Sequence, residues 1–273
     1  MRGCSVQIDA PAKLTRGLRV VGTLPGGFHA IEAEFVSLSL SDEVLVEFDV
    51  AESTVAAWGA EPELGMDWSH IPTNRDNLAI KALELVGRSA AIVLQKRIPA
   101  GGGLGGGSAD AAAVLRAARF RGDPETLAVL GADVPFCLRG GRARVTGLGE
   151  RLEPLAYEEL TFTLVIPPFS ISTAAVYAAY DRVGSGGGSN DLLAAAVEVE
   201  PALGEALEHF ERRFGAAPTL AGSGSTFFVE AGLQSLGVTP LLTKPKIRVG
   251  KIALGGVEMT MVECYATPPS TKI

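Results

Sequence analysis

The feature that most constrains this chain is a glycine run near the middle of the sequence. Six of the seven residues from 101 to 107 are glycine, interrupted only by Leu104. An ordered glycine costs about 0.5–1 kcal/mol relative to alanine in regular structure. A folded protein therefore concentrates glycines where the backbone needs unusual dihedral angles or must approach another group closely. A flexible linker is the alternative, and it suits residues 184–189 better, because no strong strand precedes them.

The sequence on either side of the run predicts a strand, then the glycine loop, then a helix. Ala91–Ile98 has the pattern of a strong strand, and the alanine-rich segment Ser108–Phe120 has an apolar stripe at helical spacing. Ser108 is a suitable N-cap, and Asp110 in the first turn suits the positive end of a helix. Free backbone N–H groups and the helix dipole then meet beside the glycines, an arrangement that suits a phosphate group.

Three known kinds of phosphate loop fit less well. No Gly-Lys-Ser/Thr follows the glycines, which excludes a Walker A loop, and the HRD and DFG motifs of protein kinases are absent. A GxGxxG spacing runs through Gly101, Gly103 and Gly106, with Asp123 at a suitable distance for a dinucleotide site. Any glycine-dense run produces that spacing by chance, and no clear second parallel strand precedes Asp123. A Rossmann-type nucleotide site stays open as an alternative.

The rest of the chain mixes strands and helices without a regular βαβ alternation, which predicts the α+β class. A boundary is expected near residues 150–158. The predicted strands are Ser5–Asp9, Leu18–Gly22, Glu34–Leu40, Glu43–Phe48, Ala143–Gly147, Leu160–Ile166, Thr226–Glu230, Ile247–Leu254 and Val257–Tyr265. The predicted helices are Asn77–Val86, Thr173–Val183, Asp191–Val199 and Pro201–Phe214. The strands 34–40 and 43–48 are expected to pair around a turn at Ser41-Asp42.

Composition excludes several classes of function. The 24 basic and 31 acidic residues give a net charge of −7, so the chain lacks the basic field of a nucleic-acid binder. Three widely spaced cysteines form no CxxC pattern and three histidines have no metal-ligand spacing, which argues against disulfides and zinc. No apolar run is long enough to span a membrane, and the amino terminus lacks the apolar core of a signal peptide. We therefore expect a cytoplasmic protein with neither nucleic-acid nor membrane partners.

Four segments together resemble the motifs of the GHMP kinase superfamily, in that family's order. The glycine run resembles its phosphate-binding motif, and the others resemble its amino-terminal motif, its catalytic-aspartate segment and its third, glycine-rich motif. Two further short segments also match, and the catalytic-aspartate segment together with Gly-Phe-His at 27–29 points to the member that acts on a cytidine diphosphate-linked polyol. The resemblance spans roughly residues 8 to 230. The four segments are residues 99–112, 10–14, 130–136 and 221–225, and the two further segments are residues 27–29 and 190–192.

The resemblance implies a fold and a chemistry. The fold would be the α+β, two-domain GHMP kinase fold, with a ribosomal protein S5 domain 2-like half over residues 1–155 and a ferredoxin-like half over residues 156–273. The active site would lie in the cleft between the halves. The protein would be a kinase that uses ATP with Mg²⁺ and phosphorylates a small-molecule alcohol. No residue is assigned as a metal ligand, and no oligomeric state is assigned.

The resemblance also implies roles for individual residues. Asp133 would accept the proton of the attacking hydroxyl, and Lys13 beside it would keep that carboxylate ionised and offset the charge that develops on the phosphate. Without the resemblance, Asp133 could equally brace a turn and Lys13 could be a solvated lysine. The residues expected to contact the nucleotide are Asn77, Lys96, Pro99, Gly101, Gly102, Gly103, Leu104, Gly105, Gly106, Gly107 and Ser108. For Asn77 and Lys96 the alternatives are a structural helix cap and a solvated side chain.

On the substrate side, the resemblance implies that Phe28 and Tyr177 enclose a cytosine ring and that His29 lies beside it. Aromatic faces bind a base by stacking, at about 1–3 kcal/mol per base. The alternatives are ordinary core positions for Phe28 and Tyr177 and a turn position for His29. Thr15 is also expected to contact substrate, and it departs from the family, which has asparagine there. Threonine cannot offer both an amide donor and a carbonyl acceptor, so the acceptor alcohol or the activity could differ.

Overall fold

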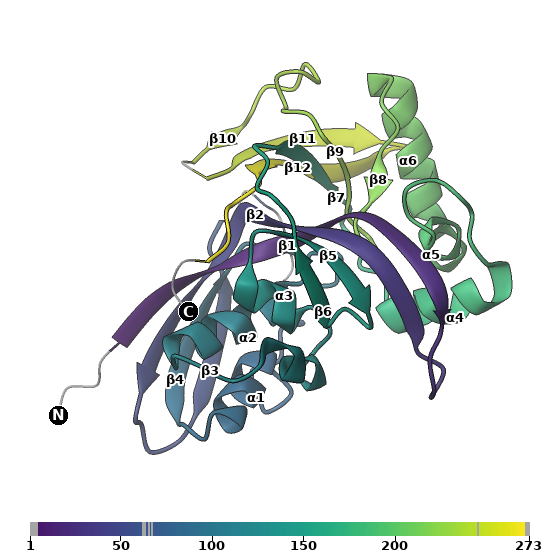
Figure 1. Cartoon of the computed structure of the whole chain (residues 1–273). Helices are drawn as coiled ribbons and strands as arrows, with labels where there is room; N and C mark the ends of the chain where they lie inside the picture. Colours follow the sequence, from purple (N-terminus) through teal and green to yellow (C-terminus); the bar gives the residue numbers. More distant parts are fainter. Residues whose placement is uncertain (1–4, 62–63, 65, 67, 245, 271–273) are drawn as a thin grey trace.

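Two long antiparallel strands, β1 (Ser5–Thr23) and β2 (His29–Phe48), dominate the amino-terminal half of the protein. The computed structural model describes residues 5–61, 64, 66, 68–244 and 246–270. Over these residues the chain forms two six-stranded sheets with helices packed on them (Figure 1). The first sheet has the order β3-β4-β2-β5-β6 with β1 paired to β2, and the second has the order β10-β11-β12-β7-β9-β8.

The remaining elements follow in chain order. The other strands of the first sheet are β3 (Thr54–Gly59), β4 (Ala90–Lys96), β5 (Arg142–Gly147) and β6 (Arg151–Pro154). Those of the second are β7 (Thr161–Ile166), β8 (Thr219–Leu220), β9 (Phe227–Val229), β10 (Leu242–Thr243), β11 (Arg248–Leu254) and β12 (Val257–Tyr265). The helices are α1 (Leu78–Leu85), α2 (Gly106–Ala117), α3 (Val134–Arg139), α4 (Thr173–Val183), α5 (Leu193–Val199) and α6 (Pro201–Phe214), with a 3-10 helix at Pro124–Val129.

The sheets confirm the α+β class and correct two details of the sequence prediction. Nearly all strand pairs are antiparallel, β3 with β4 being the parallel exception among the described strands. The prediction of a turn at Ser41-Asp42 is wrong, because both residues lie inside β2. The two short strands predicted over residues 5–22 are one strand, whose register shifts, as at Pro11/Lys13 and Thr15/Gly17, interrupt the alternating pattern.

Helix α2 is the centre of the amino-terminal core. Residues 109–115 are all buried, and the helix packs against α1, α3 and β1. Its many alanines allow close packing, because a small side chain lets the neighbouring elements approach the helix backbone. A single cluster of buried side chains joins the two sheets and contains Leu38 of β2 together with Phe162 of β7 and Val262 of β12. The glycine loop that precedes α2 is therefore held at the junction of the two sheets.

In the described part of the chain, none of the helices combines the length and apolar character that crossing a membrane requires.

Asp191 connects β1 to the segment that precedes α5. Its carboxylate accepts hydrogen bonds from the Val20 N–H at 2.9 Å, from Arg19 at 2.8 Å and from the Ser185 hydroxyl at 2.7 Å. Burial alone would raise the pKa of Asp191, but the hydrogen bonds from Ser185, Val20 and Arg19 lower it below its ordinary value. The ionised carboxylate therefore stabilises the folded state.

We expect the substitution Asp191→Asn to lower the free energy of unfolding by about 1–3 kcal/mol at pH 7, because hydrogen bonds to a charged acceptor are lost. A depressed carboxyl pKa stabilises the fold above the ordinary aspartate value of about 4, and this stabilisation disappears as the pH falls through the lower folded-state value. Denaturant unfolding of both proteins at several pH values measures the difference. A gap that stays constant down to acidic pH would contradict this assignment.

Candidate active site

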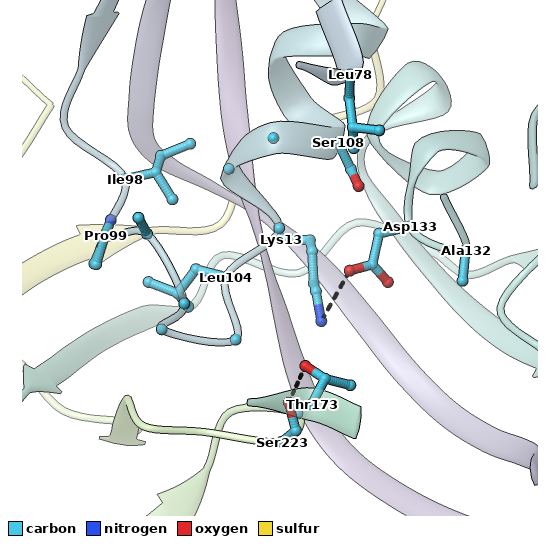
Figure 2. A pocket seen from close by; sticks show the side chains of 18 of the residues that line it. Lys13, Leu78, Ile98, Pro99, Leu104, Ser108, Ala132, Asp133, Thr173 and Ser223 are labelled. Carbon is cyan, nitrogen blue, oxygen red and sulfur yellow. Dashed lines mark hydrogen bonds and ion pairs between the residues drawn. The ribbon is translucent and has the colours of Figure 1, made fainter. Parts of the chain in front are cut away.

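A cavity of about 520 Å³ opens where the glycine loop, β1 and α4 meet (Figure 2). Its walls include the whole glycine run, Lys13 and Thr15 of β1, Asp133 before α3, Tyr177 of α4 and the second glycine-rich segment at residues 222–223. The volume suits a small-molecule or cofactor site. The structure thus brings most of the residues predicted for the site to one place. His29 and Phe28 are absent from the cavity wall among the described residues.

The glycine loop ends in the first turn of α2, and the first residues of that helix are themselves glycines. Gly105 is the N-cap in the left-handed conformation, with φ +71°, and the first hydrogen bond of the helix runs from the Ala109 N–H to the Gly105 carbonyl at 2.9 Å. The prediction that Ser108 caps the helix is therefore wrong, because Gly106 and Gly107 join the helix ahead of it. The N–H groups of residues 106–108 have no partner within the helix, which leaves them available to an anion.

The first glycines of the run serve a different purpose from the last ones. A Cβ on Gly103 would overlap the backbone carbonyl oxygen of Ala221, and a Cβ on Gly101 would lie 2.7 Å from the Cβ of Ser170. These glycines let two loops pack backbone to backbone. A Cβ on Gly105 would lie 2.8 Å from the Lys13 side chain, whereas one on Gly107 would meet nothing closer than 3.6 Å. Only the end of the run therefore has open space in front of it.

Lys13 and Asp133 lie side by side in the cavity wall and form an ion pair (Figure 2). The Lys13 Nζ lies 3.5 Å from an Asp133 carboxylate oxygen, donates to the Thr15 hydroxyl at 3.1 Å and sits 4.7 Å from the centre of the Phe35 ring. The Lys13 N–H also donates to the Leu104 carbonyl at 3.0 Å, which ties β1 to the glycine loop. Lys13 is buried rather than solvated, and the Asp133 side chain does not cap α3.

Lys96 and Asn77 line the cavity but are held by the protein itself. Lys96 is 3% exposed, and its ammonium group binds Asp42 of β2 and, at 2.6 Å, Asp110 of α2. Burial raises the pKa of Asp110 to about 7, and the Lys96 charge offsets part of that shift. Asn77 caps α1 by accepting the Ala79 N–H at 2.9 Å. The alternative of a solvated side chain is therefore wrong for Lys96, whereas the alternative of a structural helix cap is confirmed for Asn77.

The substrate-side aromatics lie differently from the expected pair. His29 stacks on Tyr177, with ring centres 5.0 Å apart, and its Nε2 lies 2.7 Å from an Asp181 carboxylate oxygen. Phe28 is 60% exposed at the tip of the β1–β2 hairpin. Burial raises the pKa of Tyr177 to about 12, so its phenol stays neutral near pH 7. Tyr177 alone of the three lines the cavity among the described residues.

Sequence reasoning gives no role at or beside this site to three polar residues, Thr173, Asp42 and Asp110. Thr173 at the start of α4 and Ser223 share a hydrogen bond of 2.8 Å between their hydroxyl oxygens, and both line the cavity opposite Lys13 (Figure 2). Ser223 belongs to the second glycine cluster, which was the one available signal for it. The sequence predicts a turn position for Asp42 and a favourable helix-end position for Asp110, because it does not reveal their shared ionic partner Lys96.

The geometry also decides between the open alternatives. The strand before the loop, β4, is parallel to β3 but antiparallel to β2, and the other described pairs of this sheet are antiparallel. A Rossmann site requires a continuous parallel sheet at this point. Asp133 lies next to Lys13 at the glycine loop rather than far from it. The loop is not a flexible linker either, because Leu104 is fully buried within it.

We expect Gly103→Ala to destabilise the protein strongly, by about 2 kcal/mol or more, because the new methyl group would overlap a backbone oxygen that cannot move aside, at a positive φ. The matched control, Gly107→Ala, places the same methyl group inside a helix in ordinary van der Waals contact with Leu78, and it should leave stability unchanged or raise it by up to about 1 kcal/mol. Thermal or denaturant unfolding measures both. Equal losses in the two variants would refute the division of the glycine run.

Comparison with known proteins identifies the family. Residues 77–141 match the family described as GHMP kinases N terminal domain. The chain is 40% identical over 179 residues, 63% of this chain and 60% of the relative, to 4-diphosphocytidyl-2-C-methyl-D-erythritol kinase of Paracoccus denitrificans. It is 32% identical to the kinase of the same name from Nitrobacter winogradskyi, over 90% of this chain and 93% of that protein.

A solved structure gives the same result. The crystal structure of 4-(cytidine 5'-diphospho)-2C-methyl-D-erythritol kinase superposes with a TM-score of 0.68 and 29% identity, covering 96% of this chain and all of that one. The two sheets of the present structure thus form the GHMP kinase fold, whose members are ATP-dependent phosphotransferases. This chain belongs to the 4-diphosphocytidyl-2-C-methyl-D-erythritol kinase family of the GHMP kinases.

Proposed function

We propose that the protein transfers the γ-phosphoryl group of ATP to the 2-hydroxyl of 4-diphosphocytidyl-2-C-methyl-D-erythritol, in non-mevalonate isoprenoid precursor biosynthesis. The observation that carries the proposal is the Lys13–Asp133 pair, which faces the same cavity as the free N–H groups at the start of α2. The names of the full-length relatives supply the acceptor. A cytoplasmic location is part of the proposal and follows from the sparse cysteines, which include no CxxC pattern.

Positioning and charge stabilisation account for most of the catalysis in phosphoryl transfer. The N–H groups of residues 106–108 and the Ser108 hydroxyl would bind the nucleotide phosphates, which are anionic and suit a helix amino terminus. The Asp133 carboxylate would take the proton of the acceptor hydroxyl as its oxygen bonds to the γ-phosphorus and ADP leaves. The Lys13 ammonium, already 3.5 Å from that carboxylate, would hold it in place and offset charge on the transferred group.

Mg²⁺ is proposed to enter with ATP. Within the described residues no group of three or more histidine, cysteine or acidic side chains could hold a metal ion. This fits Mg²⁺, which usually binds one or two protein ligands and otherwise the phosphates and water. Asp133 and Ser108 both line the cavity, and their side-chain oxygens would be among the ligands of the ion. When bound, the ion would neutralise phosphate charge.

A second candidate is a GHMP-fold kinase, or a low-activity paralogue, with another small alcohol as acceptor. Two observations favour it. The Thr15 hydroxyl already accepts a hydrogen bond from Lys13, and a hydroxyl cannot offer substrate both the amide donor and the carbonyl acceptor of an asparagine. The His29 and Tyr177 rings are 5.0 Å apart, which leaves no room for a base between them. A cytosine ring would have to stack on the cavity side of Tyr177, with Phe28 brought in from the hairpin tip.

We further propose that the chain divides near residue 155 into the two GHMP kinase domains, residues 1–155 and 156–273. Supporting this, β6 ends at Pro154 and β7 begins at Thr161, and each sheet is built from consecutive strands. The active site would then lie between the domains, since Lys13 and Asp133 come from the first and Tyr177 and Ser223 from the second.

The acceptor is tested by measuring ADP release from ATP and Mg²⁺ with a panel of alcohols that includes the cytidyl substrate. The proposal expects turnover with the cytidyl substrate at a kcat/KM far above that of the other alcohols. Turnover with another alcohol, and none with the cytidyl substrate, would establish the second candidate instead.

We expect Asp133→Asn to lower kcat about 10²–10⁴-fold, the usual contribution of a general base, because an amide cannot accept the hydroxyl proton. Binding of ATP and the unfolding temperature should change little, since Asp133 is partly exposed and caps no helix. Asp49→Asn is the matched control, because Asp49 is an exposed aspartate paired with Arg88 outside the cavity. Near-wild-type turnover in Asp133→Asn would remove the base assignment.

A further inference from the structure

Three buried charged side chains form a cluster beneath the glycine loop that the proposed reaction does not use. Lys96, at the end of β4, binds Asp42 of β2 and Asp110 of α2, the latter at 2.6 Å. Asp42 is fully buried and Asp110 is 2% exposed, so water does not solvate either carboxyl group. We refer to Asp42, Lys96 and Asp110 as the ionic triad.

The ionic triad joins the two ends of the glycine loop. The loop leaves β4 immediately after Lys96 and enters α2 at Gly106, four residues before Asp110. Asp42 also fixes the start of the loop, because its second oxygen accepts the N–H groups of Arg97 at 2.5 Å and Ile98 at 2.9 Å. One carboxylate thus holds three consecutive residues before the glycines, and Lys96 links them to the helix that follows.

The ionic triad lies close to the free N–H groups at the start of α2, where the nucleotide phosphates are proposed to bind. A Cβ on Gly106 would lie 3.5 Å from the Lys96 Nζ, so the ammonium group lies directly behind the first turn of α2. The other Asp110 carboxylate oxygen is buried without a hydrogen-bond partner, and the ion pair with Lys96 links this side chain to β4. Loss of the Lys96–Asp110 ion pair would release the helix start from the strand end.

We propose that Asp42, Lys96 and Asp110 are positioning residues for ATP: the triad sets the spacing between β4 and α2 and so orients the N–H groups of residues 106–108 toward the phosphates. In this proposal Lys96 acts on the nucleotide through this spacing, since two of its three N–H donors bind the carboxylates of Asp42 and Asp110. The inference rests on the proposed use of ATP, but it does not depend on which alcohol is the acceptor.

The test is a double-mutant cycle on the affinity for a non-hydrolysable ATP analogue, measured by calorimetry with the full chain. We expect Lys96→Met and Asp110→Asn each to weaken binding roughly tenfold or more, and the double variant to be no weaker than Lys96→Met alone, because that change already breaks the Lys96–Asp110 ion pair. If Lys96 instead contacts ATP itself, the losses multiply to about a hundredfold. That result, or analogue binding by Asp110→Asn as tight as that of the wild type, overturns the proposal.

A matched control separates positioning from a general loss of stability. Glu263 of β12 is a buried carboxylate that pairs with Arg248 at 2.7 Å in the second sheet, away from the cavity. Glu263→Gln should lower the unfolding temperature about as much as Asp110→Asn while leaving analogue affinity unchanged. An equal loss of affinity in both would mean that the triad is only structural. If Lys96→Met does not fold, the comparison of Glu263→Gln with Asp110→Asn still distinguishes a positioning role from a structural one.

Failure of this inference and failure of the proposed function give different results. Wild-type protein that binds the analogue but does not phosphorylate the cytidyl substrate refutes the acceptor and leaves the triad proposal standing. Wild-type protein that does not bind the analogue refutes both. Normal turnover with unchanged affinity in Asp110→Asn refutes the triad proposal alone.

Discussion

The contact between two glycine-rich loops is the constraint on which the site depends. Gly103 approaches the Ala221 carbonyl so closely that no side chain fits between them, and Gly101 packs against Ser170 in the same way. These contacts join the loop of the first sheet to a segment of the second. They place the free N–H groups of α2, Lys13 of β1 and Tyr177 of α4 around one cavity. Gly107, at the end of the run, has no neighbour this close, and its backbone N–H is available to a ligand.

An acidic protein that binds a nucleotide needs local positive potential, and the structure provides it from two sources. One is the start of α2, where backbone N–H groups and the helix dipole face the cavity. The other is Lys13, which is buried against Phe35 and directed by Thr15 and Asp133. Lys96, in contrast, pairs with two carboxyl groups. It therefore links β4 to α2 and adds little positive potential to the cavity.

The sequence predicts the local order of strand, glycine loop and helix well, because each depends on neighbouring residues. It predicts less well what depends on distant partners. Ser41-Asp42 has the composition of a turn, yet Asp42 lies within β2 because Lys96 and two N–H groups compensate its burial. Ser108 has the chemistry of an N-cap, yet the glycines before it extend the helix. The stacking of His29 on Tyr177, and the exposure of Phe28, follow from a hairpin meeting α4, which no local pattern encodes.

The central claim is that the Lys13–Asp133 pair and the start of α2 form one phosphoryl-transfer site. A crystal structure with a non-hydrolysable ATP analogue tests it most directly. The prediction is a triphosphate bound by the N–H groups of residues 106–108, with its γ-phosphate beside the Lys13 ammonium and the Asp133 carboxylate. A triphosphate bound elsewhere on the protein, or one whose γ-phosphate points away from Asp133, would contradict the claim.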